Sequence, residues 1–181
     1  MTVAGIDVEL RTDTGVFAKD RLDPGTEILL RRMTFPADDG DVLDLGCGYG
    51  PIAIALASRC PNARVWAVDV NERALELVRD NAKNLGIENV IAVSPDAVDP
   101  RIRFTAIYSN PPIRIGKEAL HELVTHWLSK LTEDGRAQFV VQRNLGADSL
   151  AQWMIENEYH VTRIASQRGY RVLEISRAST S

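Results

Sequence analysis

A strand-like run that leads straight into a glycine-rich turn and then into a helical run constrains this chain more than any other feature. Residues 41–45 (DVLDL) predict a buried strand, residues 46–50 (GCGYG) a tight turn, and residues 51–60 a helix that begins with proline. A strand that turns directly into a helix needs residues without a Cβ, and the three glycines supply them. The segment therefore predicts the first strand–helix unit of a parallel sheet.

Strand-like and helical runs go on alternating to the end of the chain. This alternation predicts a doubly wound α/β fold, with a mostly parallel, seven-stranded sheet and helices on both of its faces. The last two strand-like runs are joined by the three residues QRG, so we expect an antiparallel hairpin at the edge of the sheet. After the first strand, the expected strands span residues 64–70, 90–94, 104–109, 136–142, 160–166 and 170–176, and the expected later helices span residues 72–85, 118–131 and 149–157.

The length of 181 residues suits one domain, because a single hydrophobic core serves chains of this size. We expect residues 41–177 to form the main domain, residues 1–40 to form a flap packed on it, and residues 178–181 to be a frayed tail. Within the flap, residues 6–12 read as a short strand and residues 24–33 as a helix with its apolar residues on one side.

Composition argues against several classes of protein. Hydrophobic residues make up 45% of the chain, yet no apolar run approaches the ~20 residues that span a bilayer, and no signal peptide is expected at the start. The two cysteines, Cys47 and Cys60, are too few for a disulfide framework and favour a reducing, cytoplasmic setting. His121 and His126 have no cysteine pair beside them at metal-binding spacing, so we expect no metal site. Because no apolar run could span a bilayer, we also expect no membrane partner.

The glycine turn also predicts a ligand site, because glycine lets a ligand approach the backbone and a helix start offers unpaired N–H groups. Dinucleotide enzymes bind a pyrophosphate at this corner, but their spacing is Gly-x-Gly-x-x-Gly, whereas Gly46, Gly48 and Gly50 are spaced Gly-x-Gly-x-Gly. Asp44, at the end of the strand, would repel a pyrophosphate and would suit a cation such as the ammonium group of S-adenosylmethionine. The alternative is a plain tight turn without a ligand.

Two further carboxylates follow the ends of predicted strands. Asp69 could accept hydrogen bonds from both ribose hydroxyls of a nucleoside, as acidic residues do at this place in dinucleotide-binding folds. Asp96 could accept from an adenine amino group, with the backbone N–H of Ala97 as a neighbouring donor. The alternatives are a solvated carboxylate near a helix N-terminus for Asp69 and an ordinary turn residue for Asp96.

The tetrapeptide Asn110-Pro111-Pro112-Ile113 follows the fourth predicted strand directly. Two prolines end the strand and stiffen the loop, so that the side-chain oxygen of Asn110 and the carbonyl oxygen of Pro111 form a rigid pair of acceptors. Such a pair can bind both N–H groups of an exocyclic amine or an amide and leave the nitrogen lone pair aimed at a methyl donor. The alternative is a turn that merely ends the strand.

In this order and on these elements, the motifs resemble those of the class I S-adenosylmethionine-dependent methyltransferases, which are Rossmann-like and carry an Asn-Pro-Pro motif. The resemblance is closer to the small methyltransferase domain of the bacterial small-subunit (16S) ribosomal RNA guanine-N2 methyltransferases, and it covers nearly the whole chain. Residues 14–30, residues 110–124 and the segments VVQRNLGADSL and GYRVLEISR carry this closer resemblance. It implies that S-adenosylmethionine is the cofactor.

By this resemblance, the glycine turn and the aspartates line the cofactor, and the tetrapeptide holds the target amine. Phe17 and Thr26 would lie in the flap beside the cofactor and the base, and Arg114 and Lys117 at the mouth of the site. The implied catalytic residues are Asn110, Pro111, Pro112 and Ile113, and the implied cofactor contacts are Asp44, Gly46, Cys47, Gly48, Gly50, Asp69, Val70, Asp96, Ala97 and Asn110.

The chain departs from this family in two ways. Many relatives carry an aromatic residue after Asn-Pro-Pro that stacks on the target base, whereas this chain has Ile113. Stacking would have to come from Phe17 or Tyr108, or be replaced by aliphatic contact. Larger enterobacterial relatives also carry a second, degenerate copy of the domain that helps with RNA, and this chain carries one copy.

The net charge of −4 counts against a protein that binds nucleic acid with its whole surface. Binding an RNA substrate would therefore need a local patch of basic residues on the protein. Arg114 and Lys117 are the best-placed cations, because they follow the tetrapeptide. The other candidates are Arg31, Arg32, Arg101, Arg103, Arg168 and Arg171.

The preferred hypothesis is methylation of guanine N2 in small-subunit ribosomal RNA. Methylation of a glutamine side-chain amide in a protein would use the same acceptor pair, and the negative charge slightly favours it. A third hypothesis is a non-catalytic assembly factor that binds S-adenosylmethionine or RNA, against which Asp44, Asp69 and Asn110 argue, because a degenerate site would not keep them.

Overall fold

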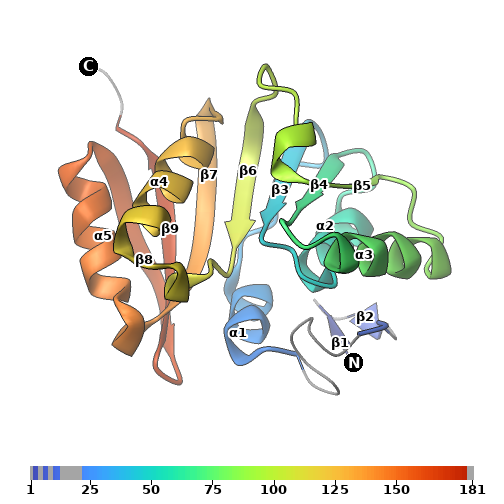
Figure 1. Cartoon of the computed structure of the whole chain (residues 1–181), viewed down its shortest axis with the longest axis horizontal. Coiled ribbons are helices and arrows are strands. Elements are labelled where there is room, and N and C mark those ends of the chain that lie inside the picture. Colours follow the sequence, from blue (N-terminus) through green and yellow to red (C-terminus); the bar gives the residue numbers. More distant parts are fainter. Residues whose placement is uncertain (1, 4–5, 8–9, 13–21, 179–181) are drawn as a thin grey trace.

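The computed structural model describes residues 2–3, 6–7, 10–12 and 22–178, and its main feature is a sheet between two layers of helices (Figure 1). The seven strands of this sheet are β3 (Asp41–Leu45), β4 (Arg64–Val68), β5 (Val90–Val93), β6 (Phe104–Ser109), β7 (Leu131–Gln142), β8 (Tyr159–Gln167) and β9 (Tyr170–Arg177). They lie in the order β5–β4–β3–β6–β7–β9–β8. The first five are parallel, whereas β9 is antiparallel to β7 and to β8, which confirms the predicted fold class and the edge hairpin.

Five helices cover the two faces of this sheet: α1 (Pro24–Arg32), α2 (Pro51–Arg59), α3 (Glu72–Asn84), α4 (Lys117–Leu128) and α5 (Ala147–Glu156). Buried side chains of α1, α2 and α3 share one core with one face of the strands, and those of α4 and α5 share a second core with the other face. Two short strands, β1 (Thr2–Val3) and β2 (Ile6–Asp7), pair with each other outside the main sheet.

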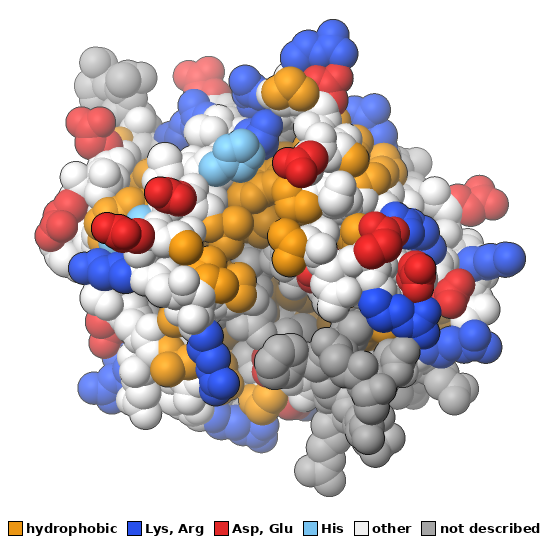
Figure 2. Space-filling view, viewed as in Figure 1, with side chains coloured by type: hydrophobic (Ala, Val, Ile, Leu, Met, Phe, Trp, Pro, Cys, Tyr) orange, Lys and Arg blue, Asp and Glu red, His pale blue; other side chains and the backbone are white. Residues whose placement is uncertain are grey.

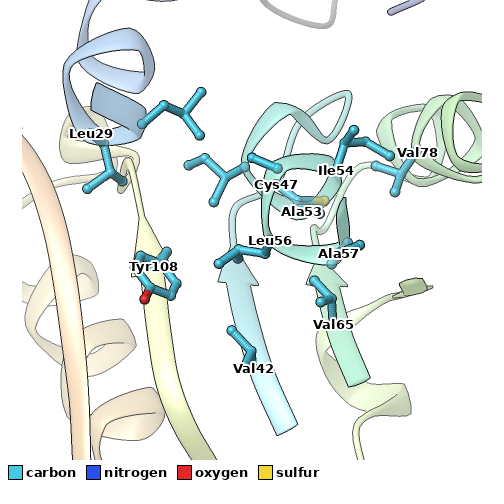
Figure 3. Packing of buried hydrophobic residues seen from close by; sticks show 14 of the residues in the cluster. Leu29, Val42, Cys47, Ala53, Ile54, Leu56, Ala57, Val65, Val78 and Tyr108 are labelled. Atoms are coloured by element: carbon cyan, nitrogen blue, oxygen red, sulfur yellow. The ribbon is translucent and has the colours of Figure 1, made fainter. Parts of the chain in front are cut away.

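Helix α2 is buried on nearly every side, and its sequence PIAIALASR explains why. Its residues from Pro51 to Ala57 are all buried, because the helix is packed between the sheet and its neighbours α1 and α3. In Figure 3, Leu56 and Ala57 of α2 lie over Val42 and Val65 of the sheet. A helix that is apolar all round is expected in such a position.

Two expectations about the chain between α4 and β7 are wrong. The fifth strand was expected to begin at residue 136, but β7 begins at Leu131, so residues 132–135 lie inside it. Between the pairs Phe104–Leu131 and Ala106–Arg136, β6 advances two residues and β7 advances five, so the extra residues bulge from the ladder. The helix expected to reach Leu131 ends at Leu128, because Leu131 already pairs with the sheet.

Several other boundaries shift by a few residues. Strand β4 ends at Val68 rather than residue 70, and α5 begins at Ala147 rather than residue 149. Of the strand expected over residues 6–12, Ile6–Asp7 form a strand and residues 10–12 do not. The expected frayed tail lies outside the described residues except for Ala178. Among the residues that the structure describes, no helix has the length and apolar character that crossing a bilayer requires.

The order of the strands creates a switch point between β3 and β6. The chain moves from β3 outward to β4 and β5, then crosses back to β6 on the other side of β3. In open α/β sheets, ligands bind outside the carboxyl ends of the strands where the order reverses in this way. The glycine turn follows β3 and the Asn-Pro-Pro tetrapeptide follows β6, so both motifs flank this crevice.

Candidate active site

The glycine turn is clamped to the neighbouring strand and leaves its backbone accessible. The N–H groups of Gly46 and Cys47 both donate to the carbonyl oxygen of Val68, over 2.8 and 3.1 Å. Gly46 and Gly48 have φ values of +71° and +55°, and no atom lies within 4 Å of the place where a Cβ would stand. Glycine is therefore needed for the turn, and a ligand has room against its backbone.

Two other residues of the turn serve packing. A Cβ on Gly50 would lie 3.0 Å from Cγ2 of Val78, so this glycine allows α2 and α3 to approach each other. The side chain of Cys47 points into the first core, and burial raises the pKa of its thiol well above the usual value. Both residues were expected at the cofactor; in this structure the side chain of Cys47 is buried, and its backbone N–H and carbonyl bond Val68 and Gly50.

Asp44 is completely buried beneath the turn. Its Oδ2 accepts from the N–H of Ala53 in the first turn of α2, over 2.9 Å, and burial raises the pKa of its carboxyl from 3.8 to about 8. Among the described residues, two buried side-chain oxygens lack a hydrogen-bond partner, Oδ1 of Asp44 and the hydroxyl of Tyr49, and both lie at this turn. Buried polar atoms without partners are rare, so a donor from a ligand is expected here.

The segment after β4 combines a fixed carboxylate with an exposed apolar side chain. Oδ2 of Asp69 accepts from the N–H of Gly48 and Oδ1 from the N–H of Asn71, each over 2.9 Å. Val70 follows, with 88% of its surface exposed. A fully exposed valine beside a fixed carboxylate offers an apolar face for the flat ring of a nucleoside.

Asp96 and Ala97 lie in a short 3₁₀ helix, η1 (Pro95–Ala97), and both are exposed. The N–H of Ala97 was expected to be free for an adenine ring. In the structure it donates to the carbonyl oxygen of Ser94 over 3.1 Å, because the tight turn after β5 uses it. The expected backbone donor is therefore engaged, and Asp96 is the remaining polar group of this pair.

Asn110 stands beside the glycine turn, since the residues before them, Ser109 and Leu45, are paired in the sheet. Its Nδ2 donates to Oδ2 of Asp23 over 2.7 Å and to Oγ1 of Thr26 over 3.1 Å. A carboxylate can only accept, so the nitrogen must face Asp23 and the oxygen Oδ1 must face the other way. The orientation of the amide is thus fixed with its acceptor available.

The second acceptor expected from the tetrapeptide is held by a tight turn. The carbonyl oxygen of Pro111 accepts from the N–H of Ile113 over 2.9 Å, around Pro112 with φ −74° and ψ 78°. These angles define an inverse γ-turn, which fixes the direction of the carbonyl and leaves its second lone pair for another donor. Ile113 itself packs against the second core, so it does not stand free over a base.

The aromatic partner expected for a target base is not Tyr108. This residue is buried in the first core (Figure 3), and its hydroxyl donates to the carbonyl oxygen of Thr34. Phe17 lies outside the described residues. Tyr170 is a better candidate: a Cβ on Gly25 would lie 3.0 Å from Cε1 of Tyr170 and 3.2 Å from Nδ2 of Asn110, so the ring stands close to the amide.

The comparisons with known proteins agree with this geometry. A model of the methyltransferase small domain family matches residues 7–174. The chain belongs to this family. It is 36% identical over 171 residues to the uncharacterized protein YbxB of Bacillus subtilis, which covers 93% of this chain and 85% of that protein. It is 33% identical to the ribosomal RNA small subunit methyltransferase C of Shewanella amazonensis, but covers only 48% of that protein, about half of its length.

Solved structures share the fold of this methyltransferase small domain. The 16S rRNA N2 G1207 methyltransferase (RsmC) of Thermus thermophilus, solved with AdoMet and guanosine, aligns with 98% of this chain and 49% of that one, with a TM-score of 0.81 at 21% identity. A methyltransferase of Pyrococcus furiosus aligns with 97% and 90%, with a TM-score of 0.73 at 21% identity. Family and fold confirm the prediction of an S-adenosylmethionine-dependent methyltransferase.

The residues of this methyltransferase small domain fit the cofactor. Open space lies beside the backbone of Gly46 and Gly48, and the unpartnered Oδ1 of Asp44 can accept from the ammonium group of S-adenosylmethionine. Asp69 and the exposed Val70 offer a carboxylate for the ribose and an apolar face for the adenine. The roles of the single residues stay predictions.

Three residues of the site were not singled out by sequence analysis. Asp23 caps α1 by accepting from the N–H of Thr26, and it also accepts from the amide of Asn110. Its sequence signal was an aspartate followed by a proline, which is typical of a helix start. Tyr170 gave no signal beyond its place in a strand. The fully buried Asn81 of α3 bonds the backbone of Arg11 and the carbonyl oxygen of Tyr49, so it ties the N-terminal segment to the glycine turn.

The basic residues expected near the site divide into two groups. Arg114 and Lys117 are exposed and follow the tetrapeptide at the carboxyl edge of the sheet. Arg101 and Arg103 precede β6, so they lie at the opposite, amino edge, and their expected role near the site is wrong. Arg143, which was not predicted, directly follows β7 at the carboxyl edge.

Proposed function

We propose that this methyltransferase small domain methylates an exocyclic amino nitrogen, and specifically N2 of a guanine in small-subunit ribosomal RNA. The orientation of Asn110 carries the proposal. Its amide nitrogen is engaged by Asp23 and Thr26, which leaves Oδ1 as an acceptor beside the glycine turn. An exocyclic amine offers the two N–H groups that such an acceptor and the carbonyl of Pro111 would bind.

S-adenosylmethionine supplies an electrophilic methyl group when it is bound. An amino group attached to an aromatic ring is a weak nucleophile, because its lone pair is delocalised into the ring. Two fixed acceptors, Oδ1 of Asn110 and the carbonyl oxygen of Pro111, would hold the amine in line and stabilise the positive charge that grows on its nitrogen. The inverse γ-turn at Pro112 keeps this pair rigid before the substrate arrives.

The relatives support guanine in RNA over other amines. The Thermus thermophilus structure is described as a 16S rRNA N2 G1207 methyltransferase with guanosine bound, and the Shewanella amazonensis relative is named a small-subunit ribosomal RNA methyltransferase. Each is about twice as long as the segment matched here. Such a substrate would also put the protein in the cytoplasm.

Methylation of purified small ribosomal subunits and of stripped small-subunit RNA tests this proposal. Mass spectrometry of the digested nucleosides should find N2-methylguanosine made by the wild-type protein. Asn110→Ala should lower turnover roughly 30- to 1000-fold, about 2–4 kcal/mol of barrier, because one fixed acceptor is lost, while the affinity for S-adenosylhomocysteine stays the same.

Asn157→Ala serves as the matched control, because the side-chain amide of Asn157 donates to the carbonyl oxygen of Trp153 at the opposite edge of the sheet. It should leave turnover unchanged. Methyl transfer to a glutamine of a ribosomal protein, with unmodified guanines, would instead support the protein-directed alternative. A large loss of cofactor affinity in Asn110→Ala would show that the role given to this residue is wrong.

A further inference from the structure

We propose that the arginines around the turn between β8 and β9 form a docking surface for the phosphates of an RNA substrate. This inference rests on the proposed function, because it assigns the RNA a place beside Asn110. We call the set Arg31, Arg32, Arg143 and Arg168 the arginine surface.

The carboxyl edge of the sheet is divided by charge. On the side of β3, β4 and β5, the residues that follow the strands include Asp69 and Asp96. On the side of β7, β9 and β8, they include Arg143 and Arg168. Asn110 stands between the two halves, since β6 lies between β3 and β7. A cationic cofactor suits the first half and an anionic chain the second.

The arginine surface adjoins the target site directly. Tyr170, whose ring lies beside Asn110 across Gly25, is the first residue of β9 and pairs with Gln142, the last residue of β7. Arg168 precedes Tyr170 by two residues, and Arg143 follows Gln142. The N–H of Arg143 donates to the carbonyl oxygen of Gly169 over 2.7 Å, so the turn is fastened to the end of β7.

Among the residues that the structure describes, two carboxylates form ion pairs with the arginines around this turn. Glu27 contacts Arg31 at 2.7 Å and Arg168 at 3.7 Å. Asp148 contacts Arg171 at 3.0 Å and Arg143 at 4.0 Å. Four arginines thus share two carboxylates, and Arg32 bonds the neutral Gln167. In these ion pairs the positive charges outnumber the negative ones, although the net charge of the chain is −4.

The cations of this surface also remain accessible. The side chains of Arg31, Arg143 and Arg168 are 62–65% exposed. In Figure 2, Lys and Arg side chains stand along the lower left margin, where Figure 1 places the turn between β8 and β9. An exposed guanidinium can bind a phosphate through two parallel hydrogen bonds, which a loosely held carboxylate partner does not prevent.

The backbone of the turn indicates that the charge at its tip serves something other than folding. Arg168 and Gly169 are the two residues of the loop and have φ values of +49° and +80°, as in a type I′ turn. Such turns prefer Asn before Gly, because an ordinary side chain is strained in the left-handed region. An arginine in this strained conformation at an exposed tip indicates that its guanidinium binds a ligand.

This strain allows a sharp test. Arg168→Asn removes the charge and gives the turn its preferred sequence, so the thermal midpoint should stay the same or rise. The double variant Arg143→Gln/Arg168→Asn should bind a short hairpin RNA about tenfold more weakly at physiological salt, measured by fluorescence anisotropy. The slope of log affinity against log salt concentration should fall in magnitude by about two, one for each lost phosphate contact.

Arg101→Gln is the matched control, because Arg101 is exposed and ion-paired with Asp99 but lies at the amino edge. It should not change RNA binding. The proposal is overturned if the double variant keeps the wild-type affinity and salt slope, or if Arg101→Gln weakens binding equally. It is also overturned if polyglutamate competes as well as RNA does, because that result would indicate an acidic protein partner. Normal RNA binding without any guanine methylation would count against the proposed function and leave the arginine surface standing.

Discussion

At the scale of single residues, the central arrangement is the pair formed by Asn110 and Asp23. Asp23 does two things with one oxygen: Oδ2 accepts from the N–H of Thr26, which caps α1, and from Nδ2 of Asn110. Without a carboxylate there, the amide of Asn110 could turn over and present its nitrogen to the target. We therefore regard Asp23 as a positioning residue that acts through Asn110.

Asp23→Asn separates the two tasks of this side chain. Asparagine caps helices as well as aspartate does, so the thermal midpoint and the affinity for S-adenosylhomocysteine should change little. Turnover should fall about 10- to 100-fold, because a hydrogen bond to a charged group that orients Asn110 is replaced by a weaker one. Asp38→Asn is the matched control: Asp38 also bonds an asparagine, Asn62, but far from the carboxyl edge, and its turnover should equal that of the wild type.

Sequence alone could place Asp44, Asp69 and Asn110 at the carboxyl ends of strands. Asp44 is the last residue but one of β3, Asp69 and Asn110 directly follow β4 and β6, and strand ends are visible in the hydrophobic pattern. It could not locate Asp23, whose bond to Asn110 joins residues 87 positions apart. The wrong assignment of Tyr108 has another cause. Side chains of a strand alternate between faces, and Tyr108 shares the face of Ala106, which packs into the first core.

At the scale of elements, the N-terminus of α1 is the part that joins the N-terminal region to the site. Gly25 lies where the helix meets the ring of Tyr170 and the amide of Asn110, both too near to accept a Cβ without a shift. The helix was predictable from its sequence, but its docking was not, because α1 packs on β7 and β9, more than a hundred residues later. The bulge in β7 escaped prediction for the same reason, since it exists only in the pairing with β6.

Gly25→Ala tests this docking. Alanine favours the helix by about 0.5–1 kcal/mol, so a purely local view predicts a more stable protein. We expect the opposite, a loss of about 1–2 kcal/mol in the free energy of unfolding together with reduced turnover, because the new methyl group lies 3.0–3.2 Å from Tyr170, Asp23 and Asn110. Chemical denaturation measures the first and methyl transfer the second. Gly25→Ser should be worse, and a stabilised, fully active Gly25→Ala would refute this account of the interface.

At the scale of the whole molecule, we expect folding and cofactor binding to be linked through one buried proton, that of Asp44. Burial raises the pKa of Asp44 from 3.8 to about 8, so the folded chain holds a proton that the unfolded chain releases between these values. The shifted pKa values of other groups affect stability in another pH range or in the opposite direction. The pKa of Asp99 is lowered to about 2 by Arg101, so its contribution is lost only in acid, and the lowered pKa of His121 makes stability rise with pH around and below 6.5.

The contribution of Asp44 should therefore decrease as pH rises from about 4 to about 8, because the unfolded state binds fewer protons over this interval. Subtracting the pH profile of Asp44→Asn from that of the wild type, both from denaturant unfolding, removes the opposing effect of His121. An ammonium group at Oδ1 favours the ionised carboxylate, so S-adenosylhomocysteine should bind more tightly as pH rises towards 8. Binding should also release a proton, which calorimetry in buffers of different ionisation enthalpy measures. In Asp44→Asn, both the pH dependence and the proton release should disappear. A wild-type affinity that is flat with pH, with no proton released, would mean that the ammonium group of the cofactor does not meet Asp44.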